Sequence, residues 1–144
     1  MLVPALLALS ALVATIVMPS GPEIPSIRGV RLGMSAEQVR ARFEDGAPAS
    51  WRTEIAGGDL ALIRAPGGSL DRESRFELHN GMLVAIRLDL PDDAPEASGE
   101  TLAITPGSVT ERAPAEPGRV ALSVLARDCP THAEEVSRIL SRGP

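Results

Sequence analysis

The chain has no lysine, no tyrosine and only three aromatic side chains, Phe43, Trp51 and Phe76. So few rings exclude a large aromatic-lined pocket for a base, a sugar or a flat cofactor, and the core must consist of aliphatic side chains. All basic residues are scattered arginines, and the formal net charge is −5. The sequence therefore excludes a basic surface of the kind that binds nucleic acid.

Motifs that carry enzymatic or metal chemistry are also missing. Cys129 is the only cysteine, so an internal disulfide is excluded, and His79 and His132 are the only histidines. There is no HExxH, CxxC, G-x-S-x-G or P-loop pattern. Cys129, His132 and His79 are too few and too dispersed in sequence to predict a zinc site. We therefore expect no enzyme, no cofactor and no metal.

Residues 2–18 form an uncharged apolar run with the length of a signal-peptide core, at the lower limit for a transmembrane helix. We expect residues 1–20 to be a signal peptide or membrane anchor and residues 21–26 to be a spacer. No basic residue precedes Arg28, and a small-x-small cleavage site is missing, so cleaved and retained forms both stay open. The expected location is extracytoplasmic, either periplasmic or anchored in the inner membrane.

Residues 27–142 have the length of a single domain. A capping box at Ser35 and Gln38 predicts a helix over about 35–44, and a second box at Thr131 and Glu134 predicts one over about 131–141. Alternating apolar residues predict strands near 51–55, 60–64, 72–78, 82–90, 101–105, 108–113 and 119–127, with an extended entry at 27–32. The expected fold is α+β: after an apolar leader helix, an antiparallel sheet of about six short strands is packed by the two helices.

Asn80 and Gly81 are typical of a tight hairpin turn. A two-residue turn would place Phe76 on the face opposite Val84, so we expect a three-residue loop over 79–81 with Gly81 in a bulge. That register would place Leu78 opposite Met82 on one face and Glu73 opposite Arg87 on the other.

Residues 91–100 are acidic and contain proline, which predicts an exposed loop. A calcium loop is the alternative for this segment. The acidic residues lack the spacing of an EF-hand and its closing glutamate, so the sequence favours the solvated loop.

Cys129 and His132 are the one pair of residues that suggests reactivity. They lie where a strand passes into a helix, and both the helix dipole and a nearby imidazole would lower the pKa of a thiol. No second cysteine is present to resolve an oxidised form. The competing interpretation is a half-buried cysteine that acts as a small apolar side chain beside an exposed histidine.

Residues 27–43 read IRGVRLGMSAEQVRARF, and residues 32–35 read LGMS before the capped helix. Together with the hairpin around Asn80 and Gly81, this stretch resembles small exported α+β domains of the BamE (SmpA/OmlA) family and of β-lactamase-inhibitory-protein-like proteins. The resemblance covers residues 27–90 and implies a non-enzymatic module that binds proteins or scaffolds the cell envelope. No cysteine ends the leader, so lipoprotein anchoring does not follow from it.

Two functions result from these observations. The leading expectation is an exported or membrane-tethered domain that binds another envelope or secreted protein, with membrane contact through the N-terminal segment if that segment is uncleaved. The alternative is a thiol-dependent redox or covalent-acceptor protein that uses Cys129 and His132.

Overall fold

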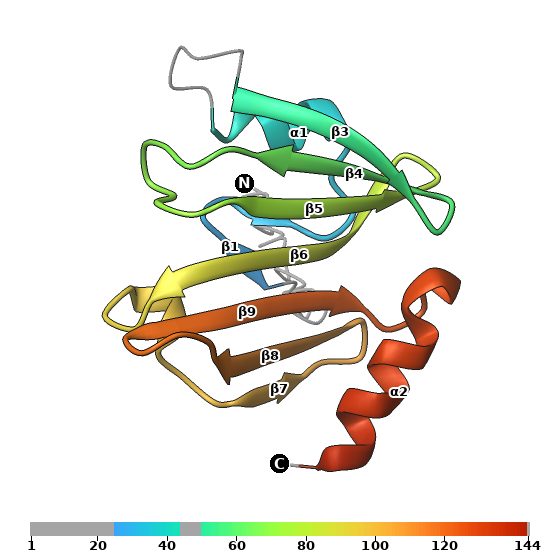
Figure 1. Ribbon diagram of the computed structural model, residues 1–144. Coiled ribbons are helices and arrows are strands. Elements are labelled where there is room, and N and C mark those ends of the chain that lie inside the picture. Colours follow the sequence, from blue (N-terminus) through green and yellow to red (C-terminus); the bar gives the residue numbers. More distant parts are fainter. Residues whose placement is uncertain (1–24, 44–49, 144) are drawn as a thin grey trace, which may run out of the picture.

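The computed structural model describes residues 25–43 and 50–143. Seven strands of this part of the chain form one antiparallel sheet, which Figure 1 shows from the face that carries α2. Two meanders build it, and they join where β6 pairs with β9. In spatial order the strands are β3 (Trp51–Ala56), β4 (Asp59–Arg64), β5 (Ser74–His79), β6 (Met82–Pro91), β9 (Arg119–Ala126), β8 (Ser108–Pro114) and β7 (Leu102–Ile104).

The remaining elements are short. The expected extended entry at 27–32 is a small hairpin, because Arg28 and Gly29 both take positive φ angles and turn the chain back on itself. Its two strands form a separate sheet. These elements are β1 (Ser26–Ile27), β2 (Val30–Arg31), α1 (Ala36–Ala41), the 3₁₀ turns η2 (Pro95–Ala97) and η3 (Pro130–His132), and α2 (Ala133–Arg142).

The prediction of an α+β domain with a six-stranded sheet packed by two helices is wrong. The described residues are mostly β, with nine strands and only two short α-helices. The helix predicted at 35–44 has six helical residues, fewer than two turns, and cannot cover a seven-stranded sheet. The helix predicted at 131–141 begins only at Ala133 and covers part of one face.

The helix start at Ser35 is confirmed. The Ser35 hydroxyl accepts from the Gln38 backbone N–H at 3.2 Å, and the Gln38 side chain accepts from the Ser35 N–H at 2.9 Å. The capping box satisfies two backbone donors that the first turn would leave without partners.

The larger core lies on the sheet face opposite α2. A row of side chains crosses the sheet there, with Leu62 opposite Phe76, Phe76 opposite Ile86, and Ile86 opposite Val124. All four are fully buried. The face is closed by the β1–β2 hairpin and the α1 segment, which add Ile27, Val30, Met34, Val39 and Phe43. On the opposite face, Val136 and Ile139 of α2 pack on Ala85, Val109 and Leu125.

The β5–β6 hairpin has a different turn and a different register from those predicted. The turn has two residues, Asn80 and Gly81, both with positive φ, so the three-residue loop is wrong. The register shift occurs inside the ladder instead, where Leu78 pairs with Leu83 while Glu77 pairs with Ala85. Val84 is therefore the extra residue of a bulge in β6. Phe76 faces Ile86 rather than Val84, and Arg75 rather than Glu73 faces Arg87.

This turn provides a stability test. We expect Gly81→Ala to lower the free energy of unfolding by roughly 1–2 kcal/mol, because an L-residue is strained at positive φ. Gly81 has φ +79 with no atom near the added methyl group, so the loss would report the backbone alone. Gly107→Ala is the matched control, because Gly107 is also unobstructed and its φ is not positive. Urea denaturation showing equal losses for both variants would contradict this account of the turn.

The leader predicted at 1–20 and most of the spacer at 21–26 lie outside the described residues. None of the helices within residues 25–43 and 50–143 is long and apolar enough to cross a bilayer. The segment predicted as an acidic exposed loop at 91–100 contains η2, and its Ala94 and Ala97 pack against the core. Glu96 in this turn forms an ion pair with Arg28 at 2.7 Å.

Candidate functional site

Three buried residues with reactive side chains meet at one end of the sheet. Asp59 is the first residue of β4, Cys129 directly precedes the η3 turn after β9, and His132 is the last residue of that turn. Their exposed fractions are 5%, 4% and 7%. One oxygen, one sulfur and one nitrogen from these residues all lie within 4.8 Å of one another. We call Asp59, Cys129, Thr131 and His132 the thiol cluster.

The Thr131 hydroxyl connects the members of the thiol cluster. It donates to Asp59 Oδ2 at 2.6 Å, and Cys129 Sγ and His132 Nδ1 lie 3.0 and 3.2 Å from its oxygen. A hydroxyl has one proton and two lone pairs, so donation to Asp59 leaves it as an acceptor for the other two groups. The contact with Asp59 joins parts of the chain that are 72 residues apart.

The prediction that Thr131 caps the C-terminal helix is therefore wrong. Pro130–His132 forms a 3₁₀ turn, and α2 has His132 at its N-cap position without a side-chain capping bond. The Thr131 hydroxyl donates to the carboxyl group of Asp59 instead, at 2.6 Å.

Glu77 holds His132 from the other side. Its Oε2 lies 3.0 Å from His132 Nε2, so an N–H at each ring nitrogen would find an acceptor, Glu77 for one and Thr131 for the other. The hydrogen bond to Glu77 outweighs the effect of burial and raises the pKa of His132 to about 9. His132 is therefore an imidazolium at neutral pH.

Glu77 also lies at the centre of a row of ion pairs on the sheet face that carries α2. Arg75 and Arg87 donate to its two oxygens at 3.0 and 3.1 Å, and Arg87 continues to Glu135 of α2 at 2.7 Å. Small side chains, Ala61 and Ala85, lie opposite Glu77 on both neighbouring strands and leave room for this network. Burial alone would raise the pKa of Glu77, but His132 and the two arginines lower it to about 2.

The lowered pKa of Glu77 predicts a pH-dependent stability. A carboxylate with a depressed pKa stabilises the fold above its ordinary pKa of 4.5, and that contribution is lost as pH falls toward about 2. We expect Glu77→Gln to lower the free energy of unfolding by about 3 kcal/mol at pH 7. The difference from wild type should shrink between pH 4.5 and 3.

Urea denaturation at several pH values measures this difference. Glu54→Gln is the control, since Glu54 binds Arg52 and Arg75 with its side chain 47% exposed, and it should cost less than about 1 kcal/mol. If the difference in free energy of unfolding between Glu77→Gln and wild type stays constant from pH 7 to 3, the ion pairs around Glu77 do not hold its carboxylate in the charged form.

Cys129 is buried, and the interpretation of a half-buried cysteine beside an exposed histidine is wrong, because His132 is buried as well. Burial alone would raise the pKa of the Cys129 thiol. The nearby His132 imidazolium, followed by the hydroxyl and the backbone N–H of Thr131, outweighs burial and lowers that pKa below its usual value. The structure thus brings together the two residues that the sequence singled out.

Sequence reasoning missed Asp59, Thr131 and Glu77 as members of this site. It also set His79 apart because of its distance along the chain, whereas His79 Nδ1 lies 2.7 Å from Asp59 Oδ1. A usable signal was the pair Gly57 and Gly58, both with positive φ, which turns β3 into β4 and places Asp59 at the strand start. The pairing of β4 with β5 then brings Asp59 next to His79.

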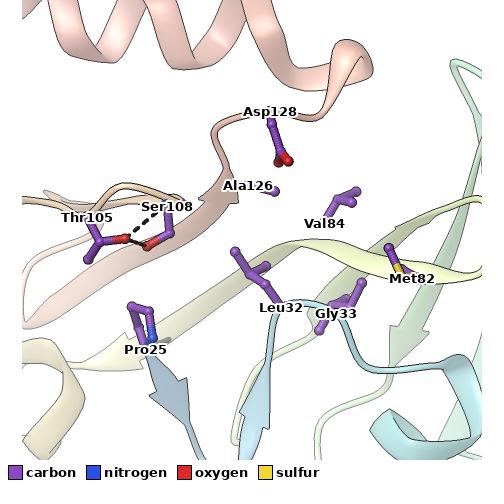
Figure 2. Close-up of a pocket in the computed structure, with 11 residues that line it drawn as sticks. Pro25, Leu32, Gly33, Met82, Val84, Thr105, Ser108, Ala126 and Asp128 are labelled. Atoms are coloured by element: carbon purple, nitrogen blue, oxygen red, sulfur yellow. Dashed lines mark hydrogen bonds between the residues drawn. The ribbon is translucent and has the colours of Figure 1, made fainter. Parts of the chain in front are cut away.

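Figure 2 shows an apolar pocket of about 260 Å³ whose lining includes Val84 and Ala126, and these two residues also pack against Cys129. Leu32, Val84 and Ala126 line it, and the same three residues form a small apolar cluster with Cys129. Val84, the extra residue of the β6 bulge, therefore borders the pocket and packs against Cys129. Asp128, which precedes Cys129, also lines the pocket.

The described part of the chain offers one set of metal-type ligands, Asp59, Cys129 and His132. The set differs from the candidates weighed from sequence, because Asp59 takes the place of His79. No protein-family model, curated protein or solved structure matches this chain. The resemblance of residues 27–90 to small exported domains stays an expectation.

Proposed function

We propose that the protein is a thiol-dependent redox protein in which Cys129 takes up an oxidising equivalent from a small hydroperoxide. The observation that carries this proposal is the position of the buried Cys129 sulfur, 3.0 Å from the Thr131 hydroxyl and within 4.8 Å of a ring nitrogen of the buried His132. A cysteine that served only as an apolar side chain would need no such partners.

The step uses groups that the cluster supplies. The Cys129 thiolate attacks one peroxide oxygen, so an S–O bond forms and the O–O bond breaks. Sulfur loses two electrons and the peroxide gains them. His132 delivers a proton to the leaving hydroxide or alkoxide, which departs as water or an alcohol, and Cys129 becomes a sulfenic acid. Return to the thiol requires an external low-molecular-weight thiol, because the chain has no second cysteine.

Burial selects the class of oxidant. Cys129 is only 4% exposed, and it packs against Val84 and Ala126, which line the pocket. A bulky disulfide cannot reach the sulfur without opening the strand end, whereas a molecule the size of hydrogen peroxide needs only small movements of these side chains. Hydrogen peroxide is therefore the probe that we would use.

Trapping the sulfenic acid tests the proposal. Chelator-treated, reduced protein is exposed to hydrogen peroxide at pH 7 together with a dimedone-type nucleophile, and the adduct is located by peptide mass spectrometry. We expect one adduct per chain, on Cys129, because the sulfenic acid is the species that such nucleophiles capture.

Methionine oxidation must be distinguished from oxidation of Cys129, and Cys129→Ser is the control for this. Met82 is 56% exposed and would form a sulfoxide in wild type and in Cys129→Ser alike. Peroxide that oxidises methionine while Cys129 remains a free thiol would overturn the proposal. Adduct formation in wild type and its absence in Cys129→Ser would support it.

The expectation of an exported or membrane-tethered domain that binds an envelope protein stays a prediction. It depends on residues 1–20, which lie outside the described residues, and on the resemblance of residues 27–90. Affinity capture from crosslinked envelopes, with a specific partner as the expected result, is the experiment for it.

A further inference from the structure

We propose that Asp59, Cys129 and His132 bind a single Zn²⁺ ion through Asp59 Oδ2, Cys129 Sγ and His132 Nδ1. Three different ligand types converge within 4.8 Å of one another, and each comes from a buried residue. A mixed set of sulfur, nitrogen and oxygen suits Zn²⁺, whereas Ca²⁺ and Mg²⁺ prefer oxygen alone.

The surroundings orient each ligand toward the centre of the cluster. Glu77 lies 3.0 Å from His132 Nε2, which leaves Nδ1 directed at the other members. His79 lies 2.7 Å from Asp59 Oδ1, which leaves Oδ2 on the inner side. A carboxylate on the outer nitrogen of a histidine is the arrangement that fixes ring orientation in zinc sites.

The charges also match a divalent cation. A Cys129 thiolate and the Asp59 carboxylate carry two negative charges, which a Zn²⁺ ion neutralises inside a buried site. His132 then coordinates as a neutral imidazole, with its remaining proton on the nitrogen that faces Glu77. One ion would thereby neutralise both buried acidic groups.

The geometry requires a small contraction. Bonds of 2.0–2.3 Å in a tetrahedron place zinc ligands about 3.3–3.7 Å apart, and His132 Nδ1 and Asp59 Oδ2 are 4.0 Å apart. The Thr131 hydroxyl lies among the three ligand atoms, so it must rotate aside when the ion enters. Rotation of one threonine side chain leaves the fourth position to water, as in three-ligand zinc sites.

This metal site goes beyond the peroxide chemistry and does not depend on it. A zinc-bound thiolate shares its lone pair with the metal, so we expect Zn²⁺ to protect Cys129 from oxidation. Zinc binding is measured without any oxidant, so failure of one proposal is distinguishable from failure of the other.

The test is competition for Zn²⁺ alone between the reduced protein and a chromogenic chelator. We expect one ion per chain with a dissociation constant of about 1 μM or tighter. Cys129→Ser, His132→Gln and Asp59→Asn should each weaken binding by at least ~100-fold, more than the loss of an outer-shell partner. Co²⁺ substitution should give a thiolate-to-metal charge-transfer band in wild type that is absent in Cys129→Ser.

Asp128→Asn is the matched control, because Asp128 is an exposed acid directly before Cys129 and is not one of the three proposed ligands. It should bind Zn²⁺ as tightly as wild type. Circular dichroism of each variant shows that the sheet is intact. Absence of binding to folded wild type, or binding that all three ligand variants retain, would overturn the proposal.

Discussion

Phe76→Ala should lower the free energy of unfolding by about 3–5 kcal/mol, the range for removing a large buried aromatic side chain. Phe76 is fully buried at the middle of the apolar row, and its ring centroid lies 5.5 Å from Phe43 and 5.9 Å from Trp51. All three aromatic side chains of the chain meet here, so the truncation removes ring contacts as well as buried area. Urea denaturation followed by circular dichroism measures the loss.

Ile55→Ala is the control for this truncation. Ile55 lies on the edge strand β3 and is 76% exposed, so we expect a change within about 0.5 kcal/mol. If Phe76→Ala fails to fold at all, Phe76→Leu keeps the test quantitative, with a smaller loss. A Phe76 variant no less stable than the Ile55 variant would refute the position of the core described above.

His132→Gln should slow the reaction of Cys129 with hydrogen peroxide at pH 7 by at least about tenfold, since it removes the proton donor for the leaving group, and general acid catalysis is typically worth about 10²–10⁴-fold. In the proposed reaction, His132 supplies the positive charge beside the sulfur and the proton for the leaving group. Glutamine keeps a donor for Glu77 but carries no charge. Stopped-flow kinetics on chelator-treated, folded protein measures the rate constant.

His79→Gln is the matched control, because His79 contacts the thiol cluster through the outer oxygen of Asp59. We expect its rate to stay within about threefold of wild type, since its influence on the thiol passes through Asp59 and Thr131. Equal slowing in both histidine variants would indicate a general loosening of the cluster rather than a direct effect of His132 on the sulfur.

Local patterns predicted the strands well and the architecture poorly. Alternation located the long strands to within one or two residues, because each has one face in a core. The number of strands in the sheet and the small share of helix depend on which strands pair, and pairing is set by contacts distant in sequence. The hairpin is an example. The sequence showed that a two-residue turn at Asn80 and Gly81 would place Phe76 and Val84 on opposite faces, but it did not show the bulge at Val84.

Only the residues of the candidate site that are close together in sequence were predictable. Cys129 and His132 are three residues apart, so a strand passing into a helix was enough to suggest their contact. Asp59 and Glu77 reach them across 70 and 55 residues through the order of β4, β5, β6 and β9. Thr131 was misread because a capping box and a long-range hydrogen bond use the same hydroxyl, and the sequence shows only the local option.

The rate of Cys129 oxidation in folded and in urea-unfolded protein tests the central claim most directly. Burial alone would make the folded thiol slower than the unfolded one, because access is restricted. We expect the reverse: in metal-free protein at pH 7, the folded form reacts with hydrogen peroxide faster than the unfolded form, because the lowered pKa of Cys129 raises its thiolate fraction and His132 is placed to protonate the leaving group. A folded protein that reacts no faster than the unfolded chain would contradict the assignment of Cys129 as an activated thiol.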